Sequence, residues 1–486
     1  MREKEVLKPL PFQVADIAKM KRHNYTALLS IETGGTKTAL SLFSHIDSGS
    51  SRTLIVAPEQ THGSAWLPTM EKLDLEGRVI GNSNKAKRQA LSDFELGFPG
   101  IYLVTPQLFS RSDVSAWSGD LAILDEAHGL MSPKGQGQRR TGGYSPRDNP
   151  ISTRFDGRMA LSGTPLRNRF QLSWGLSRFL YPALNKRGQI AHDQFFVWEA
   201  DRMNYQTVYT SKRDQFGRPV TVKQYHGEKI PGKWISELPC VITHKKREAC
   251  CEFHPNGFMD LDEPTVIEET ITLAPAQKKA IREMESMLVT YLDENPMIAD
   301  IPLTKAQRIR QLTLGVPTLI PADDSFEVMF DTECVSPYFD RLVDILQNDI
   351  EDETAVVYTS SQKFAAVVTE RLNRLGIPAF EFSGATRKDR DQKAKEFGTR
   401  YRVMVGVLAA VAEGFDGIQH VTNNEVWLDR STDETLNEQA MGRTDRMGQT
   451  KQVMRWIFHD DLGISEGRYS EQVTKRLQLN RSLKVA

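Results

Sequence analysis

The chain has 486 residues, of which 39% are hydrophobic and 26% charged, and its formal net charge at pH 7 is −1. This composition is typical of a soluble globular protein with about two to four domains. The near-zero net charge excludes proteins that bind nucleic acid through an overall positive charge. Any contact with nucleic acid must therefore use local positively charged patches. No stretch approaches the roughly 20 apolar residues of a membrane span, and the N-terminus lacks the apolar core of a signal peptide.

Cysteine usage favours a reducing compartment, and we expect a cytoplasmic rather than a secreted protein, because four cysteines are too few for a disulfide scaffold. Several residues of zinc-ligand types cluster in one segment: Cys240, His244, Cys250, Cys251 and His254. Their spacing matches no standard pair of CxxC knuckles, so we favour free thiols and leave metal binding open.

The first predicted element is a short amphipathic helix within residues 7–21, with Val14, Ile17 and Ala18 on one face. Gln13 stands near its start, and its amide can bond two edges of an adenine. A solvated glutamine at the start of a helix is the alternative interpretation.

A phosphate-binding loop is predicted next, because an apolar strand at 25–31 runs into a glycine-rich turn at 32–38 and a helix beginning at Ala39. Gly34 and Gly35 would let backbone N–H groups cradle phosphates, while Lys37 meets the terminal phosphates and Thr38 can bind Mg²⁺. The usual Gly-x-x-x-x-Gly-Lys-Thr spacing would place glycines where this chain has Ile31 and Thr36.

The stretch at 121–128 is the central element of the first half. Four apolar residues there run directly into Asp125 and Glu126, as in a buried parallel strand that ends at a ligand-binding edge. Asp125 is placed to hold Mg²⁺, directly or through water, and Glu126 to polarise an attacking water. Further buried strands are predicted at 52–58 and 101–106, and their polar turns either touch a nucleic-acid backbone or are ordinary loops.

Residues 131–150, rich in Gly, Arg and Pro, are expected to form a mobile loop in which Arg139 and Arg140 either contact nucleic-acid phosphate or are solvated. A strand near 158–161 then ends in a tight polar turn formed by Ser162, Gly163 and Thr164. A helix over 170–180, bearing Trp174, follows.

The second half starts with a polar, irregular segment and helical patterns at 275–292 and 304–314, which together predict an insertion over 181–330. Strands and helices alternate again from Ser336, and this alternation predicts a second parallel α/β unit. The predicted strands lie at 355–358, 378–382, 401–408 and 425–428, with a helix at 361–375.

Two loops of this second unit carry candidate functional residues. The first is glycine-rich and includes Gly414 and Asp416. The second includes Gln439 and puts Arg443 and Arg446 three positions apart, as on one face of a helix. The two arginines could reach a γ-phosphate, although a solvated basic face is the alternative.

In this order the motifs resemble those of the superfamily-two helicase-like ATPases, and more closely the Swi/Snf-type DNA translocases. The resemblance rests on five stretches: residues 7–13 (glutamine motif), 32–38 (nucleotide loop), 125–128 (Asp-Glu-Ala-His box), 161–168 (Leu-Thr-Gly-Thr-Pro-x-x-Asn) and 439–449 (Gln-Ala-x-x-Arg-x-x-Arg-x-Gly-Gln). It covers most of the chain and is weakest over 181–330.

The resemblance implies an α/β fold with two RecA-like parallel-sheet domains and a helical insertion between them: domain 1 at 1–180, the insertion at 181–330, and domain 2 at 331–486. ATP and Mg²⁺ would bind between the two domains. The implied catalytic residues are Lys37, Asp125, Glu126, Arg443 and Arg446, with Mg²⁺ held by Thr38 and Asp125. The implied nucleotide-binding residues are Gln13, Gly34, Gly35, Thr36, Lys37, Thr38, Gly414 and Asp416, and the coupling residues are His128, Ser162, Gly163, Thr164 and Gln439.

The implied function is an ATP-dependent, DNA-stimulated translocase on duplex or forked DNA that contacts the backbone without base specificity. The alternatives are a strand-separating helicase, a restriction translocase subunit, and a DNA-binding clamp whose ATPase is impaired by Thr36. The length of the chain favours a compact bacterial or viral form, in the host cytoplasm if viral. Replication or recombination proteins are the expected partners, and no membrane is expected.

Overall fold

In the computed structural model the chain forms two compact units, the first made of Met1–Asp260 and Val473–Ala486 and the second of Leu261–Gln472. The structure describes residues 7–32, 34–145, 147–167, 169–184, 195–213, 217–248, 257, 259–292, 295–299, 302–322, 325–386, 389–414, 417–467, 470 and 483. Within these ranges no helix is both long enough and apolar enough to span a membrane.

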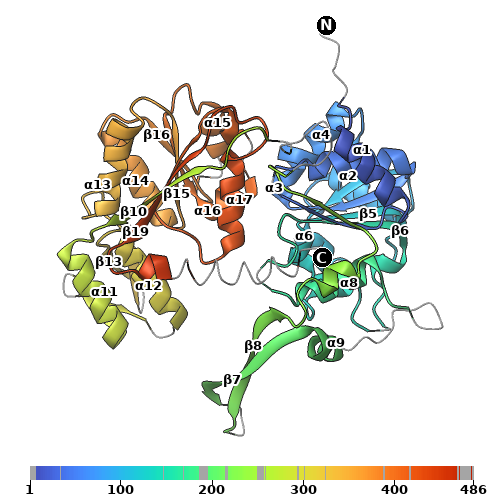
Figure 1. The fold of residues 1–486 in the computed structure, drawn as a ribbon, viewed down its shortest axis with the longest axis horizontal. Coiled ribbons are helices and arrows are strands. Elements are labelled where there is room, and N and C mark those ends of the chain that lie inside the picture. Colours follow the sequence, from blue (N-terminus) through green and yellow to red (C-terminus); the bar gives the residue numbers. More distant parts are fainter. Residues whose placement is uncertain are drawn as a thin grey trace. The chain divides into compact units, whose positions relative to one another are not determined.

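The first unit is built on a parallel sheet of seven described strands in the order β3-β4-β2-β5-β6-β1-β9 (Figure 1). The strands are β1 Ala27–Ile31, β2 Arg52–Val56, β3 Gly77–Val79, β4 Gly100–Val104, β5 Gly119–Asp125, β6 Phe155–Leu161 and β9 Val241–His244. The strands predicted from the apolar runs of the first half are therefore confirmed, with ends that differ by at most three residues.

Apolar residues cover both faces of this sheet, because successive side chains along a strand point to opposite sides. In β5, Leu121 and Ile123 belong to the core on one face, whereas Ala122 and Leu124 belong to the core on the other. The helices of the first unit are α1 Pro11–Lys21, α2 Lys37–Ser48, α3 Glu59–Thr61, α4 Leu67–Lys72, α5 Lys85–Glu95, α6 Pro106–Arg111, α7 Gln136–Thr141, α8 Leu172–Leu180, α9 Phe195–Arg202 and α10 Lys233–Ser236. Helices α1, α2 and α4 pack on the first face, and α5, α6, α8 and α10 on the second.

The second unit repeats this plan with a parallel sheet of six described strands in the order β10-β19-β18-β15-β17-β16. The strands are β10 Thr265–Ile271, β15 Ala355–Thr359, β16 Ala379–Phe382, β17 Val403–Val407, β18 Asn424–Trp427 and β19 Met454–Asp460. The helices are α11 Pro275–Met287, α12 Pro302–Leu314, α13 Pro337–Asp344, α14 Gln362–Arg374, α15 Arg390–Lys395, α16 Leu408–Gly414 and α17 Glu434–Thr444.

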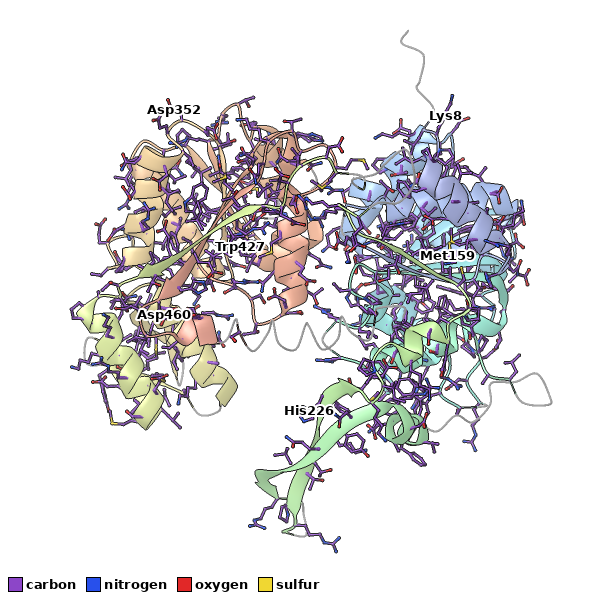
Figure 2. The ribbon with its side chains drawn as sticks, in the orientation of Figure 1. Lys8, Met159, His226, Asp352, Trp427 and Asp460 are labelled. Atoms are coloured by element: carbon purple, nitrogen blue, oxygen red, sulfur yellow. The ribbon has the colours of Figure 1, made fainter. Side chains whose placement is uncertain are left out.

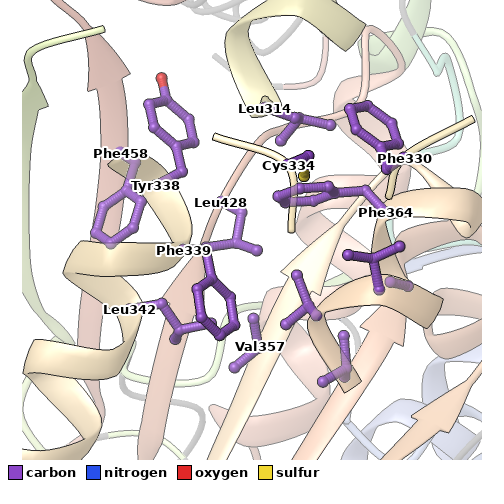
Figure 3. Close-up of a cluster of buried hydrophobic side chains, with 14 of the residues drawn as sticks. Leu314, Phe330, Cys334, Tyr338, Phe339, Leu342, Val357, Phe364, Leu428 and Phe458 are labelled. Atoms are coloured by element: carbon purple, nitrogen blue, oxygen red, sulfur yellow. The ribbon is translucent and has the colours of Figure 1, made fainter. Parts of the chain in front are cut away.

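A large apolar core joins α11 to α14 with one face of this second sheet. Phe339 and Leu342 of α13 point towards Val357 and Leu428, and Phe364 of α14 packs edge-to-face against Phe330 at 5.0 Å between ring centroids (Figure 3). Helices α16 and α17 cover the opposite face. The prediction of two parallel α/β sheets is therefore confirmed.

Residues 181–330, expected to form an insertion, are divided between the two units. Strand β9 pairs with β1 in the first sheet, and β10 pairs with β19 in the second. Helices α11 and α12 agree with the predicted helical patterns, although the first pattern ends early because β11 (Val289–Leu292) pairs with β12 (Asn295–Ile298). A further antiparallel pair joins β13 (Thr318–Ala322) to β14 (Ser325–Met329).

The polar segment after Asp201 forms a β-hairpin rather than an irregular stretch. Strands β7 (Met203–Arg213) and β8 (Pro219–Glu228) pair antiparallel and extend away from the sheet of the first unit (Figure 1). His226 lies on the hairpin, well apart from Met159 in the sheet (Figure 2). Tyrosine, threonine and valine alternate with polar residues here, which is a strand pattern.

Two smaller expectations were wrong. In α1 the buried residues are Phe12, Gln13, Asp16 and Met20, whereas Val14 is 53% exposed, because the helix turns a different face to the sheet. The stretch 131–150 is not simply a loop, since α7 lies within it and buries Gln138 and Thr141.

Candidate functional site

The candidate site of the first unit lies at the carboxyl ends of three adjacent strands, β5, β6 and β1. The pairing register sets Asp125 opposite Leu161, and Leu161 opposite Leu29. The chain therefore leaves the sheet at one edge in three places, which are the phosphate loop after β1, the two carboxylates of β5 and the polar turn after β6. Open α/β sheets bind ligands at this edge.

The phosphate loop turns sharply before α2. Gly34 has φ +86° and Thr36 has φ +62°, and the Gly35 N–H donates to the Glu32 carbonyl at 2.9 Å. The helix begins at Lys37, two residues earlier than predicted, which places Thr38 in its first turn. The Lys37 ammonium donates to the Ile31 carbonyl at 3.1 Å, so this side chain folds back over the loop. Backbone N–H groups at such a helix start favour phosphate.

Gln13 reaches this loop from α1. Its Nε2 donates to the Thr36 hydroxyl at 2.8 Å, and its Oε1 accepts the Leu10 N–H at 2.9 Å. The Gln13 side chain is buried, so it is not the solvated glutamine of the alternative interpretation. The structure therefore joins the predicted adenine-binding residue directly to the predicted phosphate loop.

The Asp125 carboxylate is buried at the end of β5 and has a partner on each oxygen. Trp66 Nε1 donates to one oxygen at 3.0 Å, and the Glu126 N–H donates to the other at 3.1 Å. Burial, with the neighbouring negative charge of Glu126, raises the pKa of Asp125 to about 6, against the opposing effect of Lys37. The two adjacent carboxylates repel each other, and one lysine offsets this repulsion only in part. A divalent cation would reduce the remaining repulsion.

These residues fit Mg²⁺, which prefers oxygen ligands and is usually bound through one or two carboxylates plus phosphate oxygens. Asp125 and Thr38 are the side chains that would hold it, and the ion would neutralise charge on a bound triphosphate. Among the described residues no group of three His, Cys, Asp or Glu side chains could hold a metal alone.

The raised pKa of Asp125 implies that metal binding at this site depends on pH. Below about pH 6 the Asp125 carboxyl is protonated, and it must lose that proton to hold Mg²⁺. We therefore expect the Mg²⁺-dependent part of ATP affinity to fall as the pH is lowered from about 7 to about 5, measured by calorimetry with and without Mg²⁺. Asp125→Asn is the matched control, because it keeps the titration of ATP itself. Equal pH slopes in the two proteins would contradict the assignment.

Ser162, after β6, is the centre of a small polar cluster. Its hydroxyl lies 3.1 Å from Nδ1 of His128, donates to a Glu126 oxygen at 3.4 Å, and accepts the Thr164 N–H at 3.1 Å. Glu126 itself has a left-handed backbone with φ +46°. The predicted coupling residues of the first unit are thus brought together with the candidate base, and Gly163 lies in the turn between two of them.

In the second unit the predicted arginines do not share a helical face. Helix α17 contains Gln439 and Arg443 but ends at Thr444, and Arg446 lies in the turn that follows. The chain leaves the helix at Asp445, which is buried and has ψ 78°. The Arg443 guanidinium donates to the Ala412 carbonyl of α16.

Five of the predicted positions give little or no geometry. Gly414 is the last residue of α16, and Asp416 lies outside the described residues. Cys250, Cys251 and His254 also lie outside them. Of the other two members of that cluster, Cys240 is a buried free thiol and His244 Nε2 lies 2.7 Å from an Asp16 oxygen.

Two features went unnoticed in the sequence. Trp66, which holds Asp125, lies in a single π-helical turn, His62–Trp66, and nothing in its local spacing marks it. In the second unit a buried ion pair joins Glu425 to Arg455 at 2.6 Å, and Trp427 Nε1 also donates to Glu425 at 2.9 Å. The charged residues inside strands β18 and β19 were the available signal for this pair.

No family model matches the chain. Protein CHROMATIN REMODELING 24 of Arabidopsis thaliana is 21% identical over 469 residues, covering 87% of this chain and 41% of that protein. Helicase SWR1 of Cryptococcus neoformans is 24% identical over 285 residues, covering 50% of this chain and 21% of that protein. The chain spans less than half the length of either one.

Two solved structures of a Sulfolobus solfataricus SWI2/SNF2 ATPase core, one of them in complex with dsDNA, align with 99% of this chain. The alignments cover 98% and 92% of those chains, at 16% and 15% identity and TM-scores of 0.40 and 0.38.

Proposed function

We propose that the chain is a DNA-stimulated ATPase that translocates along duplex or forked DNA in replication, recombination or repair. The observation that carries the proposal is the convergence of Lys37, Asp125 and Glu126 at one sheet edge, with Thr38 in the first turn of α2. A phosphate loop beside two carboxylates provides the groups that phosphoryl transfer to water requires: a phosphate-binding site, a metal ligand and a residue that orients water. The chromatin-remodelling and helicase names of the relatives support DNA as the partner.

In this proposal each residue has a defined task. Lys37 moves from the Ile31 carbonyl to the terminal phosphates, and Asp125 and Thr38 hold Mg²⁺, which neutralises charge on the phosphates when bound. Glu126 orients and polarises the attacking water. Arg443 and Arg446 are the proposed source of positive charge for the transition state, since a guanidinium is always charged.

Ser162 and His128 are the proposed link between hydrolysis and movement. Each side chain lies 3.4 Å from a Glu126 oxygen, and the two are 3.1 Å apart. A shift of Glu126 in response to the γ-phosphate would therefore move the turn after β6. Cycles of nucleotide binding and release would then alternate the grip of the two units on the DNA backbone. We place this activity in the cytoplasm of a bacterium or an infected host.

The DNA part of the proposal is tested by fluorescence anisotropy with duplexes of unrelated sequence. Contacts to phosphate alone give equal affinities for all sequences, and each affinity falls linearly with salt on a log–log plot. Strong discrimination between sequences would contradict the proposal, as would affinity that does not depend on salt.

A strand-separating helicase is the second candidate, and the β7–β8 hairpin favours it. The hairpin extends from the first unit and carries exposed Arg213 and Arg218 (Figure 1). Its base is fixed, because the buried Glu199 of α9 accepts hydrogen bonds from Lys223 and Tyr225. A projection with a fixed base and positive charge is a suitable wedge at a fork.

Shortening the hairpin separates the two candidates. Replacing residues 209–221 with Asn-Gly keeps the paired Val208 and Val222 and the anchor on Glu199, and supplies a two-residue turn. If the hairpin is a wedge, the variant loses strand displacement on forked DNA but keeps duplex-stimulated ATP turnover. A variant that still displaces strands at the wild-type rate would exclude the wedge. The substitutions Arg213→Gln and Arg218→Gln, made together, test the contribution of charge alone.

A further inference from the structure

The hydrogen bond between Gln13 and Thr36 links two parts of the candidate nucleotide site. The donor atom is Nε2 of Gln13 and the acceptor is Oγ1 of Thr36, 2.8 Å apart. Gln13 is only 2% exposed, and its other polar atom already accepts the Leu10 N–H. The amide is therefore fixed in one orientation before any nucleotide arrives.

Thr36 has a backbone conformation that its residue type rarely adopts. Its φ of +62° and ψ of 26° lie in the left-handed region, which glycine adopts freely and β-branched residues avoid. The residue is also the N-cap of α2, yet its side chain makes no capping hydrogen bond to the helix. The hydroxyl instead accepts the hydrogen bond from Gln13, which directs the side chain towards α1.

Helix α1 is itself held in place at this end of the sheet. His244 Nε2, at the end of β9, lies 2.7 Å from an Asp16 oxygen, and the ring of Phe12 packs edge-on against His244 at 5.1 Å. Gln13 thus projects from a fixed helix, and any movement of its amide acts on the loop through Thr36.

We propose that Gln13 is a positioning residue for the phosphate loop, and that Thr36 transmits its effect. The inference rests on the proposed function, since it assigns a task within the same nucleotide site. Gln13 keeps the Thr36 side chain turned away from the phosphates and so allows threonine to stand where the loop needs a left-handed residue. Recognition of the base and binding of the phosphates are then coupled through one hydrogen bond.

The test is a double-mutant cycle on Mg²⁺-ATP affinity, measured by calorimetry for the wild type, Gln13→Ala, Thr36→Gly and the double variant. If Gln13 acts through Thr36, its removal weakens binding at least about fivefold more when threonine is present than when glycine is present, because neighbours that share a contact are not additive. Effects that add within about twofold would overturn the proposal. Absence of ATP binding in the wild type would instead refute the proposed function.

A ligand without a base gives the second readout. The inhibition constant of inorganic tripolyphosphate with Mg²⁺, corrected for the ATP affinity of each protein, should be higher for Gln13→Ala than for the wild type, although Gln13 then has no base to contact. Unchanged competition by tripolyphosphate would overturn the proposal. Thr36→Ser keeps the hydroxyl and should behave as the wild type, whereas Thr36→Val should resemble Gln13→Ala. Gln89→Ala, at an exposed glutamine of α5, is the matched control, and thermal unfolding shows which variants fold.

Discussion

Replacing Lys37 with alanine is expected to abolish ATP turnover, with a loss of at least about 100-fold, while DNA binding is largely retained. Lys37 opens α2 beside the phosphate loop, and it is the cation whose charge opposes the raised pKa of Asp125. Its removal deletes the positive charge that would meet the terminal phosphates as negative charge shifts during transfer. The measurement is steady-state phosphate release at saturating duplex DNA.

Lys85→Ala is the matched control for this experiment, because Lys85 is an exposed lysine that starts α5 in the same unit. It removes the same charge from the chain and should leave turnover unchanged. Turnover of Lys37→Ala equal to that of Lys85→Ala would refute the assignment of the nucleotide loop. Loss of both turnover and DNA binding, with a lowered melting temperature, would point to misfolding.

Glu126→Gln is expected to keep ATP binding but to reduce the maximal turnover by about 100- to 10,000-fold, the range of a lost general base. The side chain stands beside Asp125 and accepts a hydrogen bond from Ser162 at 3.4 Å. Glutamine has nearly the same shape but cannot accept a proton from water. Single-turnover hydrolysis and ATP binding by calorimetry, measured on the same sample, separate the chemical step from binding.

Glu71→Gln makes the same change at an exposed position of α4 and serves as the control. A Glu126→Gln protein that loses ATP affinity but keeps its maximal turnover would give Glu126 a role in binding rather than catalysis. Because Glu126 also raises the pKa of Asp125, its replacement should lower that pKa, so the loss of Mg²⁺ binding on acidification should begin at a lower pH. This second effect distinguishes Glu126 from a residue that acts only on water.

The sequence was sufficient for the parts of the fold that depend on local pattern. Apolar runs such as 121–124, buried on both faces, predict parallel strands because both sides of each strand must be covered. The polar residues that follow those strands then meet at one edge, although the assignment of Lys37 and Asp125 to one nucleotide site came from the family resemblance. The boundary near Asp260 escaped notice, because β9 ends at His244 and β10 begins at Thr265, both within one polar stretch, and yet the two strands join different sheets.

Contacts between distant segments could not be predicted in this way. Trp66 and Asp125 are separated by 59 positions and Gln13 and Thr36 by 23, and no spacing rule connects either pair. The helical face assigned to Arg443 and Arg446 was wrong because a buried residue, Asp445, ends α17 between them. Periodicity describes a helix that continues, but tertiary contacts decide where it stops.

The central claim is that DNA drives ATP turnover at the edge formed by β5, β6 and β1. The most direct test is steady-state ATP hydrolysis without DNA and with single-stranded, duplex or forked DNA. The Lys37→Ala variant, measured under the same conditions, is the negative control. We predict strong stimulation by duplex or forked DNA and none in the variant. Stimulation by single strands alone would favour the helicase, and tight DNA binding without turnover on any DNA would contradict the claim and favour an ATPase-impaired clamp.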